Sequence, residues 1–230
     1  MPGLRFDLEI IPNLDDAERA PPPLTRPKMG PRRTRTVALG HDAQMRGAAV
    51  IDTAHLRAAL NATAFRPQDW PQALETCRIA LGATLVGVIR LYEDGGDLLG
   101  PPERTEAHLD AYRAGGWCAN DPRAAAISSL KTGRIYTDAC LLPETTRASS
   151  DFYRDFALRQ DVPHMACWRA EDASDEPLFF SVTFGASHGP LRAQERAALE
   201  AIKEQATAAL ALSRAIQFTQ EQGALNGLDM

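Results

Sequence analysis

The stretch HMACWRAEDASDEPLFFSVTFG, residues 164–185, contains the clearest pair of strands in the chain. Its last eight residues are rich in aromatic and β-branched side chains, which favour strands. The seven residues EDASDEP in its middle are acidic, small or proline, which is typical of a turn. Two strands joined by so short a connection predict an antiparallel hairpin. A third strand is predicted over residues 83–92, ATLVGVIRLY.

Helical patterns surround these strands. Helices are predicted over residues 53–64, 67–80, 105–114, 121–133 and 143–160, with Gly82 ending the second. The longest apolar stripe runs over residues 190–218, which at about 1.5 Å per residue gives some 40 Å of helix. That length exceeds what one small sheet needs, so part of this helix is expected to pack against another copy or to carry a downstream domain.

Few strands are joined by helical crossovers, and the clearest pair is antiparallel. The sequence therefore predicts an α+β fold, in which an antiparallel sheet is flanked by helices and followed by a long C-terminal helix. This arrangement is similar to the GAF/PAS-like sandwich.

Composition limits the class of protein. The chain has 230 residues, of which 44% are hydrophobic, so it contains enough apolar material for a buried core. The formal net charge of −5 argues against a surface that binds nucleic acid throughout. No run approaches the roughly 20 apolar residues that span a bilayer, and the N-terminus lacks the order of a secretory signal. The sequence predicts a soluble, cytoplasmic protein that does not contact a membrane.

The two ends differ from the middle. Residues 1–50 hold seven of the sixteen prolines before residue 32 and five basic residues between Arg26 and Arg35. We expect a disordered Pro/Arg-rich tail, and two alternatives stay open: a basic arm for nucleic acid or acidic lipid, and a gene start placed too early, with Met45 as the true initiator. Residues 51–218 form the predicted domain. Residues 219–230 contain two glycines and are predicted to be a flexible C-terminal tail.

Signatures of common catalytic and cofactor sites are missing from the sequence. It contains no phosphate-binding GKS or GKT, no GxGxxG, no GxSxG and no HExxH. The four cysteines form no CxxC pair, and the five histidines are scattered. We therefore expect no enzyme, no metal site and no cofactor.

The segment HLDAYRAGGWCANDP, residues 108–122, is the most informative one for function. A buried carboxylate needs hydrogen-bond donors, which a ligand amide or a local backbone N–H can supply to Asp121. The simpler interpretation of Asp121 is a helix N-cap ahead of Pro122. Tyr112 and Trp117 are candidates either for a pocket or for core packing with their polar ends at the surface.

This segment resembles the ligand-binding domain of LuxR-type quorum-sensing regulators, whose hallmark is Trp-x3-Tyr, eight residues, then Asp-Pro. The resemblance implies that Tyr112 hydrogen-bonds the acyl amide region of a signal and that Asp121 accepts from its amide N–H. His108 stands where the family has a tryptophan that contacts the lactone, and Tyr136 lies near the position of a second tryptophan. The similarity spans roughly residues 53–218.

A second stretch, GRIYTDACLLPETTRASSDFYRDFALRQ, resembles the sensor domains of LuxR-type regulators that have no known homoserine-lactone signal. Two departures from the lactone-binding pattern point the same way. The first is the missing tryptophan. The second is Asp161-Val162-Pro163, which stands where a Gly-x-x-x-Gly would follow the FYRDF helix.

The leading hypothesis is a small-molecule-sensing regulatory domain that binds a small amphipathic ligand between the sheet and the helices. Tyr112 and Asp121 would make polar contacts, with His108, Trp117 and Tyr136 lining the pocket. Ser181 and Thr183 share one face of their strand, which is either pocket or solvent.

A homodimer is expected through the long helix 190–218. LuxR-type regulators carry their helix-turn-helix after the sensor, and the twelve residues after this helix are too few for one. We therefore expect no direct nucleic-acid binding by this chain, which would be a truncated regulator or an independent sensor.

Two alternatives belong to other classes. The first is a GAF-like dimerisation or interaction module with a filled core and no ligand. The second is a Cys-dependent GAF-type reductase, for which Cys118, beside the Asp121 loop, is the best-placed thiol.

Overall fold

The computed structural model describes residues 50–92, 95–170 and 177–228. The tail predicted for residues 1–50 lies outside the described residues, apart from Val50. The α-helices are α1 (Thr53–Thr63), α2 (Trp70–Leu81), α3 (Pro102–Ala114), α4 (Pro122–Ile127), α5 (Asp138–Leu141), α6 (Glu144–Ser149) and α7 (Ala193–Leu228). Shorter segments are the 3-10 turns η2 (Pro67–Asp69) and η3 (Trp117–Ala119) and the π-helix η4 (Phe152–Ala157). The strands are β1 (Leu85–Tyr92), β2 (Gly95–Leu99), β3 (Tyr136–Thr137), β4 (His164–Ala170) and β5 (Leu178–Phe184).

The five strands form one sheet in the order β2-β1-β5-β4-β3, and every neighbouring pair is antiparallel. The predicted hairpin is confirmed, because His164 pairs with Phe184 and Ala170 with Leu178 along the full length of β4 and β5. The third predicted strand is β1, which pairs with the other side of β5. The α+β fold predicted from the sequence is therefore confirmed.

Strand β2 was not predicted, because Glu93–Gly96 (EDGG) has the composition of a turn. Its sequence, GGDLL, begins with residue types that are depleted in strands. Pairing with β1, from Val88↔Leu99 to Tyr92↔Gly95, holds this segment in the sheet.

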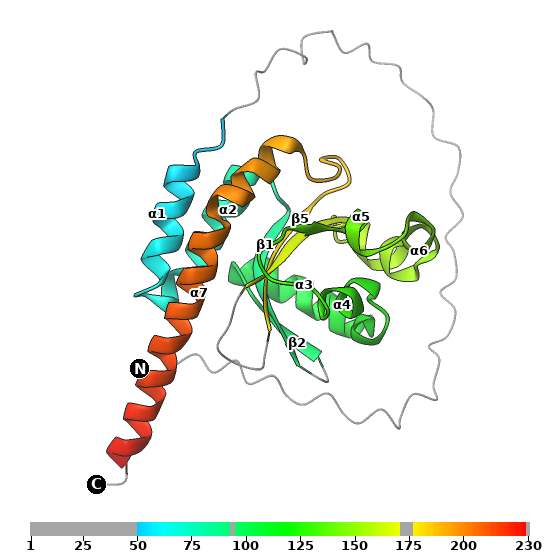
Figure 1. Ribbon diagram of the computed structural model, residues 1–230. Helices are drawn as coiled ribbons and strands as arrows, with labels where there is room; N and C mark the ends of the chain where they lie inside the picture. The colour runs from blue at the N-terminus through cyan, green and yellow to red at the C-terminus, as the bar shows by residue number, and fades with distance from the viewer. Residues whose placement is uncertain (1–49, 93–94, 171–176, 229–230) are drawn as a thin grey trace. The chain divides into compact units, whose positions relative to one another are not determined.

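Helices cover both faces of the sheet, as Figure 1 shows: α1, α2 and α7 lie on one side, and α3 to α6 lie on the other. Alternate residues of a strand point to opposite faces. Ala166 and Trp168 of β4, with Phe180 and Val182 of β5, face the first side and belong to the largest core cluster. The Trp168 ring stacks on Phe180 with centroids 4.3 Å apart. Alternation therefore places one large apolar core on the α7 side of the sheet.

Local sequence signals explain how this first layer begins and ends. Asp52 caps α1, with its carboxylate accepting hydrogen bonds from the backbone N–H groups of Ala54 and His55. Gly82 ends α2 in the left-handed conformation, at φ 62°, where glycine carries no Cβ penalty. Gly82 was predicted to end this helix, which is confirmed, and of the two candidate caps for α1, Asp52 and Thr53, the structure has Asp52.

Helix α7 runs from Ala193 to Leu228 and so continues ten residues past its predicted end at Phe218. Because of Gly223 and Gly227, a flexible tail was predicted after Phe218, and for residues 219–228 the structure has helix instead. A glycine inside a helix costs only about 1 kcal/mol, and Thr219–Gln222 and Ala224–Leu225 are otherwise compatible with a helix.

None of the helices in the described part of the chain is both long enough and apolar enough to span a membrane.

Candidate functional site

Tyr112 and Asp121 meet on the side of the sheet opposite α7. Tyr112 lies in the last turn of α3, and Asp121 lies directly before α4, with the η3 turn between them. The phenol oxygen of Tyr112 donates a hydrogen bond to Oδ2 of Asp121 over 3.3 Å. Both residues are partly buried. Burial, and then the neighbouring Asp121 carboxylate, raise the pKa of Tyr112, so the phenol stays protonated and acts as a donor.

Asp121 is also a helix N-cap. Its Oδ1 atom accepts from the backbone N–H of Arg123 at 2.8 Å, and Pro122 occupies the first position of α4. The helix N-cap role and the proposed ligand contact therefore use different oxygens of the Asp121 carboxylate. Oδ1 caps the helix, and Oδ2 faces Tyr112.

Aromatic rings surround this pair. Phe152 and Phe156, both buried on the π-helix η4, contact the rings of Tyr112 and Trp117 with centroids 5.4 to 6.4 Å apart. The His108 ring lies edge-on to Phe156 at 5.1 Å. Four residues that the sequence indicated, His108, Tyr112, Trp117 and Asp121, are thus brought together.

The sequence predicted one continuous helix over residues 143–160, and this was wrong. Helix α6 ends at Ser149, and η4 is a π-helix whose wider turn sends Phe152, Tyr153 and Phe156 inward. Segments of this kind are rare and are frequently found at functional sites.

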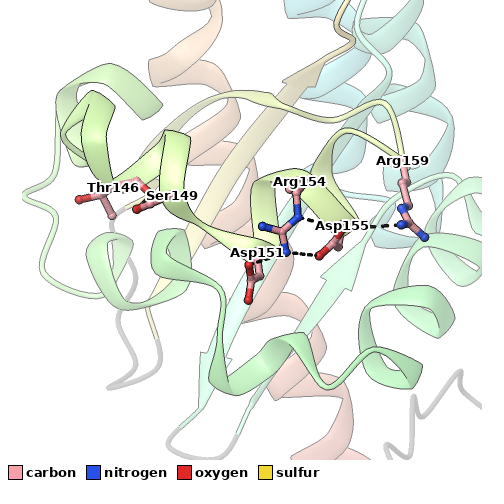
Figure 2. Close-up of polar contacts among 6 residues, drawn as sticks. All are labelled: Thr146, Ser149, Asp151, Arg154, Asp155 and Arg159. Atoms are coloured by element: carbon pink, nitrogen blue, oxygen red, sulfur yellow. Dashed lines mark hydrogen bonds and ion pairs between the residues drawn. The ribbon is translucent and has the colours of Figure 1, made fainter. Parts of the chain in front are cut away.

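The outer side of η4 carries only paired charges. Arg154 donates to Asp151 over 2.5 Å and to Asp155 over 2.7 Å, and Arg159 lies 3.6 Å from Asp155 (Figure 2). In the preceding helix, the Ser149 hydroxyl donates to the carbonyl of Thr145. Solvent-exposed ion pairs of this kind add little to stability. The residues of η4 that can line a ligand site are therefore the buried ones, Phe152, Tyr153 and Phe156.

Arg123 is a buried cation at the centre of the site, and only 6% of its surface is exposed. Its guanidinium lies over the Phe152 ring, 4.5 Å from the centroid, and Nη1 donates to the carbonyl of Val162 over 3.3 Å. Its Nε lies 3.5 Å from Oδ1 of Asp121. Burial opposes the charge, but Asp121 and Asp138 outweigh burial and raise the pKa of the guanidinium.

Asp138 connects this cluster to the sheet. Its carboxylate is 3% exposed and accepts hydrogen bonds from the Tyr153 phenol, at 2.6 Å, and from the backbone N–H of Met165 on β4. Burial, and then Asp138, raise the pKa of Tyr153. Neither Asp138 nor Arg123 was singled out from the sequence. The available signal was an arginine in the otherwise apolar helix PRAAAI, and an aspartate directly after the strand residues Tyr136–Thr137.

The remaining predicted site residues lie on the face of the sheet that α3 to α6 cover. Tyr136 on β3, Cys167 on β4 and Ser181 on β5 are paired neighbours across three strands, so their side chains share that face. Ser181 and Thr183 are buried there, and the Thr183 hydroxyl donates to the carbonyl of Leu85. Of the two options that the sequence left open for this face, solvent is excluded. Tyr136 and Tyr112 belong to different apolar clusters. Tyr136 packs against the cluster that contains Cys167, whereas Tyr112 packs against Phe152 and Phe156.

Burial, and then the neighbouring Arg123, lower the pKa of His108 to about 4, below the value of about 6.5 for a solvated histidine. The unfolded chain therefore binds the proton more tightly, and stability is lost as the pH falls from about 6.5 to about 4. The difference corresponds to about 3 kcal/mol. In urea unfolding at pH 7 and pH 4.5, wild type should lose about 2 to 3 kcal/mol more than His108→Gln. The exposed His55→Gln should follow wild type, and equal losses in all three proteins would contradict the assignment.

The four cysteines are free thiols. Burial raises the pKa of Cys77 and of Cys167 to about 12, which makes both unreactive at neutral pH. Cys118 and Cys140 are exposed, and hydrogen bonding by Thr137 lowers the pKa of Cys140. Within the described ranges, no three His, Cys, Asp or Glu side chains are grouped so that they could hold a metal ion.

Comparison with solved structures finds a similar fold in a domain of known structure. The ligand-binding domain of VqsR from Pseudomonas aeruginosa superposes with a TM-score of 0.57 at 14% identity, covering 70% of this chain and 96% of that domain. Lower scores are obtained with the N-acylhomoserine-lactone-dependent LuxR-family transcription factor CepR2 from Burkholderia cenocepacia (TM-score 0.49, 15% identity, 71% and 98% covered). The phycoerythrobilin-bound GAF domain of a cyanobacterial phytochrome also superposes with a lower score (TM-score 0.46, 12% identity, 72% and 98% covered).

At the level of sequence, no protein-family model and no curated protein matches the chain. The likeness to solved structures therefore concerns the fold alone, which is the predicted antiparallel sheet flanked by helices.

Proposed function

We propose that this chain is the small-molecule-sensing domain of a LuxR-type regulator and that it binds a small amphipathic ligand between the sheet and the layer of α3 to α6. The convergence of Tyr112 and Asp121 within 3.3 Å, inside a shell of aromatic rings, carries the proposal. A partly buried phenol and carboxylate that face each other offer one donor and one acceptor to a ligand. The aromatic rings provide the apolar surroundings that most ligand sites have.

Each residue has a distinct role in this proposal. Asp121 Oδ2 accepts a hydrogen bond from a ligand N–H or O–H, while its Oδ1 atom continues to cap α4. In the ligand-bound state the Tyr112 O–H, which donates to Asp121 in this structure, turns to a ligand oxygen, and the His108 and Trp117 rings contact the apolar part of the ligand. Tyr136, Ser181 and Thr183 form the wall on the sheet side.

A second candidate is the ligand-free interaction module. The rings of His108, Tyr112, Trp117, Phe152 and Phe156 pack edge-on or tilted at ordinary aromatic distances, so they already bury one another. A core of this kind is stable without a ligand. The two candidates differ in one measurable property, which is whether any small molecule stabilises the protein through Asp121.

The ligand test is a thermal-shift screen of acyl lactones, acyl amides and aryl amides. A compound that binds only the native state adds about 2.7 kcal/mol of stability at one hundred times its Kd, so a binder raises Tm by several degrees. Asp121→Asn preserves an N-cap but loses the charge. It should weaken a binder about 10- to 100-fold, because a hydrogen bond to a charged group contributes about 1.5 to 3 kcal/mol.

The control is Asp110→Asn, on the exposed side of α3, which should bind like wild type. If every compound that stabilises wild type binds Asp121→Asn and Tyr112→Phe with unchanged affinity, the site is wrongly assigned. If no compound in a broad screen stabilises wild type, the interaction module is the better account.

A homodimer through α7 is part of this proposal. The hydroxyl of Ser213 donates to the carbonyl of Thr63 at the end of α1, and fifteen helical residues, 214–228, follow. This segment is roughly 22 Å long and runs past α1 (Figure 1). Isolated helices of about 12 to 15 residues are marginal in water, so a partner would stabilise it. Phe218 on this segment is 64% exposed.

Phe218→Glu should therefore weaken the dimer at least tenfold, because it places a charge in an apolar contact. Sedimentation velocity over a range of protein concentrations measures the effect. Ile79 on α2 is equally exposed, at 65%, and Ile79→Glu serves as the matched control. A wild-type chain that stays monomeric at high concentration, or two variants that dissociate equally, would contradict an interface on α7.

Direct contacts lead from the candidate site to the start of α7. Arg123 donates to the carbonyl of Val162, and the preceding Asp161 has a left-handed backbone, at φ 55°. The Asp161 carboxylate accepts from the backbone N–H of Ala186 at 2.8 Å, in the loop that enters α7. A Cβ at Gly185 would lie 2.3 Å from this carboxylate, so a larger residue there would displace the Asp161 side chain. These contacts support a ligand effect on the dimer, because a ligand that binds one arrangement better shifts the population toward it.

A further inference from the structure

Arg123 has more hydrogen-bond donors than its surroundings use. A guanidinium carries five N–H donors and no acceptor. Among the described residues, one of these makes a hydrogen bond, from Nη1 to the Val162 carbonyl. Nε is fully buried without a hydrogen-bond partner, and its nearest carboxylate oxygen, on Asp121, lies at 3.5 Å. Buried donors are nearly always paired in folded proteins, so this one requires an explanation.

The acceptors around Arg123 are already engaged. Asp121 Oδ1 accepts from the Arg123 backbone, and Asp121 Oδ2 accepts from Tyr112. Asp138 accepts from Tyr153 and from the backbone of Met165. Neither carboxylate accepts a hydrogen bond from Arg123 Nε, so this donor stays unpaired in the cluster. A ligand that completes it must bring an acceptor.

The charges around Arg123 limit what that acceptor can be. Asp121 and Asp138 are two carboxylates that attract one guanidinium, and both act on Arg123 through space. His108, the other titratable side chain with a basic nitrogen near Arg123, is uncharged at neutral pH. The cluster has a formal charge of −1, so a further anion would be repelled by both carboxylates in surroundings that screen charge poorly.

We infer that Arg123 determines the specificity of the site by donating to an uncharged sp² oxygen on the ligand, a carbonyl, and that the site rejects the corresponding carboxylate. This inference rests on the proposed ligand site. It adds Arg123, which is more deeply buried than Tyr112 and Asp121, as a third polar anchor. The position of the guanidinium over the Phe152 ring, 4.5 Å from the centroid, holds it next to the aromatic shell.

Three probes with one skeleton test it: 4-phenylbutanamide, 4-phenylbutanoate and 4-phenylbutan-1-ol. All three bring the same apolar body, and only the first brings a neutral carbonyl. Titration calorimetry at pH 7.5 on the wild-type chain should give binding of the amide at millimolar concentration, at least tenfold tighter than binding of the acid or the alcohol. This comparison needs no variant, so it does not depend on how Arg123 substitutions fold.

Arg123→Met should then lose the preference, so that amide and alcohol bind within twofold of each other. Arg154→Met is the matched control, because it removes an exposed arginine that is bonded to two carboxylates on the outer side of η4 (Figure 2). It should keep the wild-type preference.

Several results would overturn the inference: tighter binding of the acid, no binding of the amide, or a preference that survives in Arg123→Met. A failure of the proposed function would give a different result from a failure of this inference. If screening compounds bind through Asp121 but are indifferent to Arg123, the sensor site stands and the role of Arg123 is wrong. If nothing binds through Asp121, both are wrong.

Discussion

Asp138→Ala should lower the free energy of unfolding by about 3 to 5 kcal/mol. The substitution leaves the Tyr153 phenol and the Met165 backbone N–H without an acceptor in the interior, and each unpaired buried donor costs about 1 to 3 kcal/mol. It also removes a buried negative charge that helps to hold Arg123 in its charged form. Urea unfolding followed by circular dichroism measures the effect.

The matched control for Asp138→Ala is Asp110→Ala, at an exposed position of α3, which should unfold like wild type. Tyr153→Phe should be milder than Asp138→Ala, because it removes one donor and leaves the carboxylate bonded to Met165. A loss below 1 kcal/mol in Asp138→Ala would mean that Asp138 does not connect the site to the sheet.

Trp168→Ala should be about as destabilising, by about 3 to 5 kcal/mol, which is the usual cost of truncating a buried aromatic residue. The Trp168 side chain is 1% exposed, stacks on Phe180, and donates from Nε1 to the Thr207 hydroxyl of α7 over 3.2 Å. It therefore fixes the sheet to α7 by both packing and a hydrogen bond. Thermal and urea unfolding should both report the loss.

Phe65→Ala is the control for Trp168→Ala, because the Phe65 ring is 73% exposed and its removal should change stability by less than about 0.5 kcal/mol. Trp168→Phe should recover part of the loss by keeping an aromatic ring against Phe180. If Trp168→Ala unfolded like wild type, the sheet and α7 would not share one core.

Features that depend only on nearby residues in the sequence, such as the buried face of a helix, could be predicted. The stripe of Trp70, Leu74, Cys77 and Leu81 is buried as its helical spacing indicated, because a helix face depends only on local periodicity. The length of α7 and the strand β2 were not predictable in this way. Both depend on tertiary or cross-strand contacts that override weak local propensity.

The candidate site shows the same division. Tyr112 and Asp121 are nine residues apart, and one short connection is enough to bring them together. Asp138 is fifteen residues from Tyr153 and twenty-seven from Met165, so their contacts arise only when α5, η4 and β4 are packed. The sequence identified the part of the site that is local, and the structure added Arg123 and Asp138.

The sheet separates two layers with different proposed tasks. The α7 side contains the larger core and the proposed dimer helix, and the other side contains the candidate ligand site. The chain has three tryptophans, and they divide between these layers. Trp117 contacts Phe152 and Phe156 in the site, whereas the indoles of Trp70 and Trp168 donate to Ser213 and Thr207 of α7.

These three indole N–H groups report which layer a small molecule enters. In ¹H–¹⁵N spectra of the labelled protein, titration with a compound from the stabilising set should move the Trp117 indole resonance furthest, with those of Trp70 and Trp168 close to their starting positions. The opposite pattern, in which Trp70 or Trp168 responds and Trp117 stays fixed, would contradict a ligand site formed around Tyr112 and Asp121.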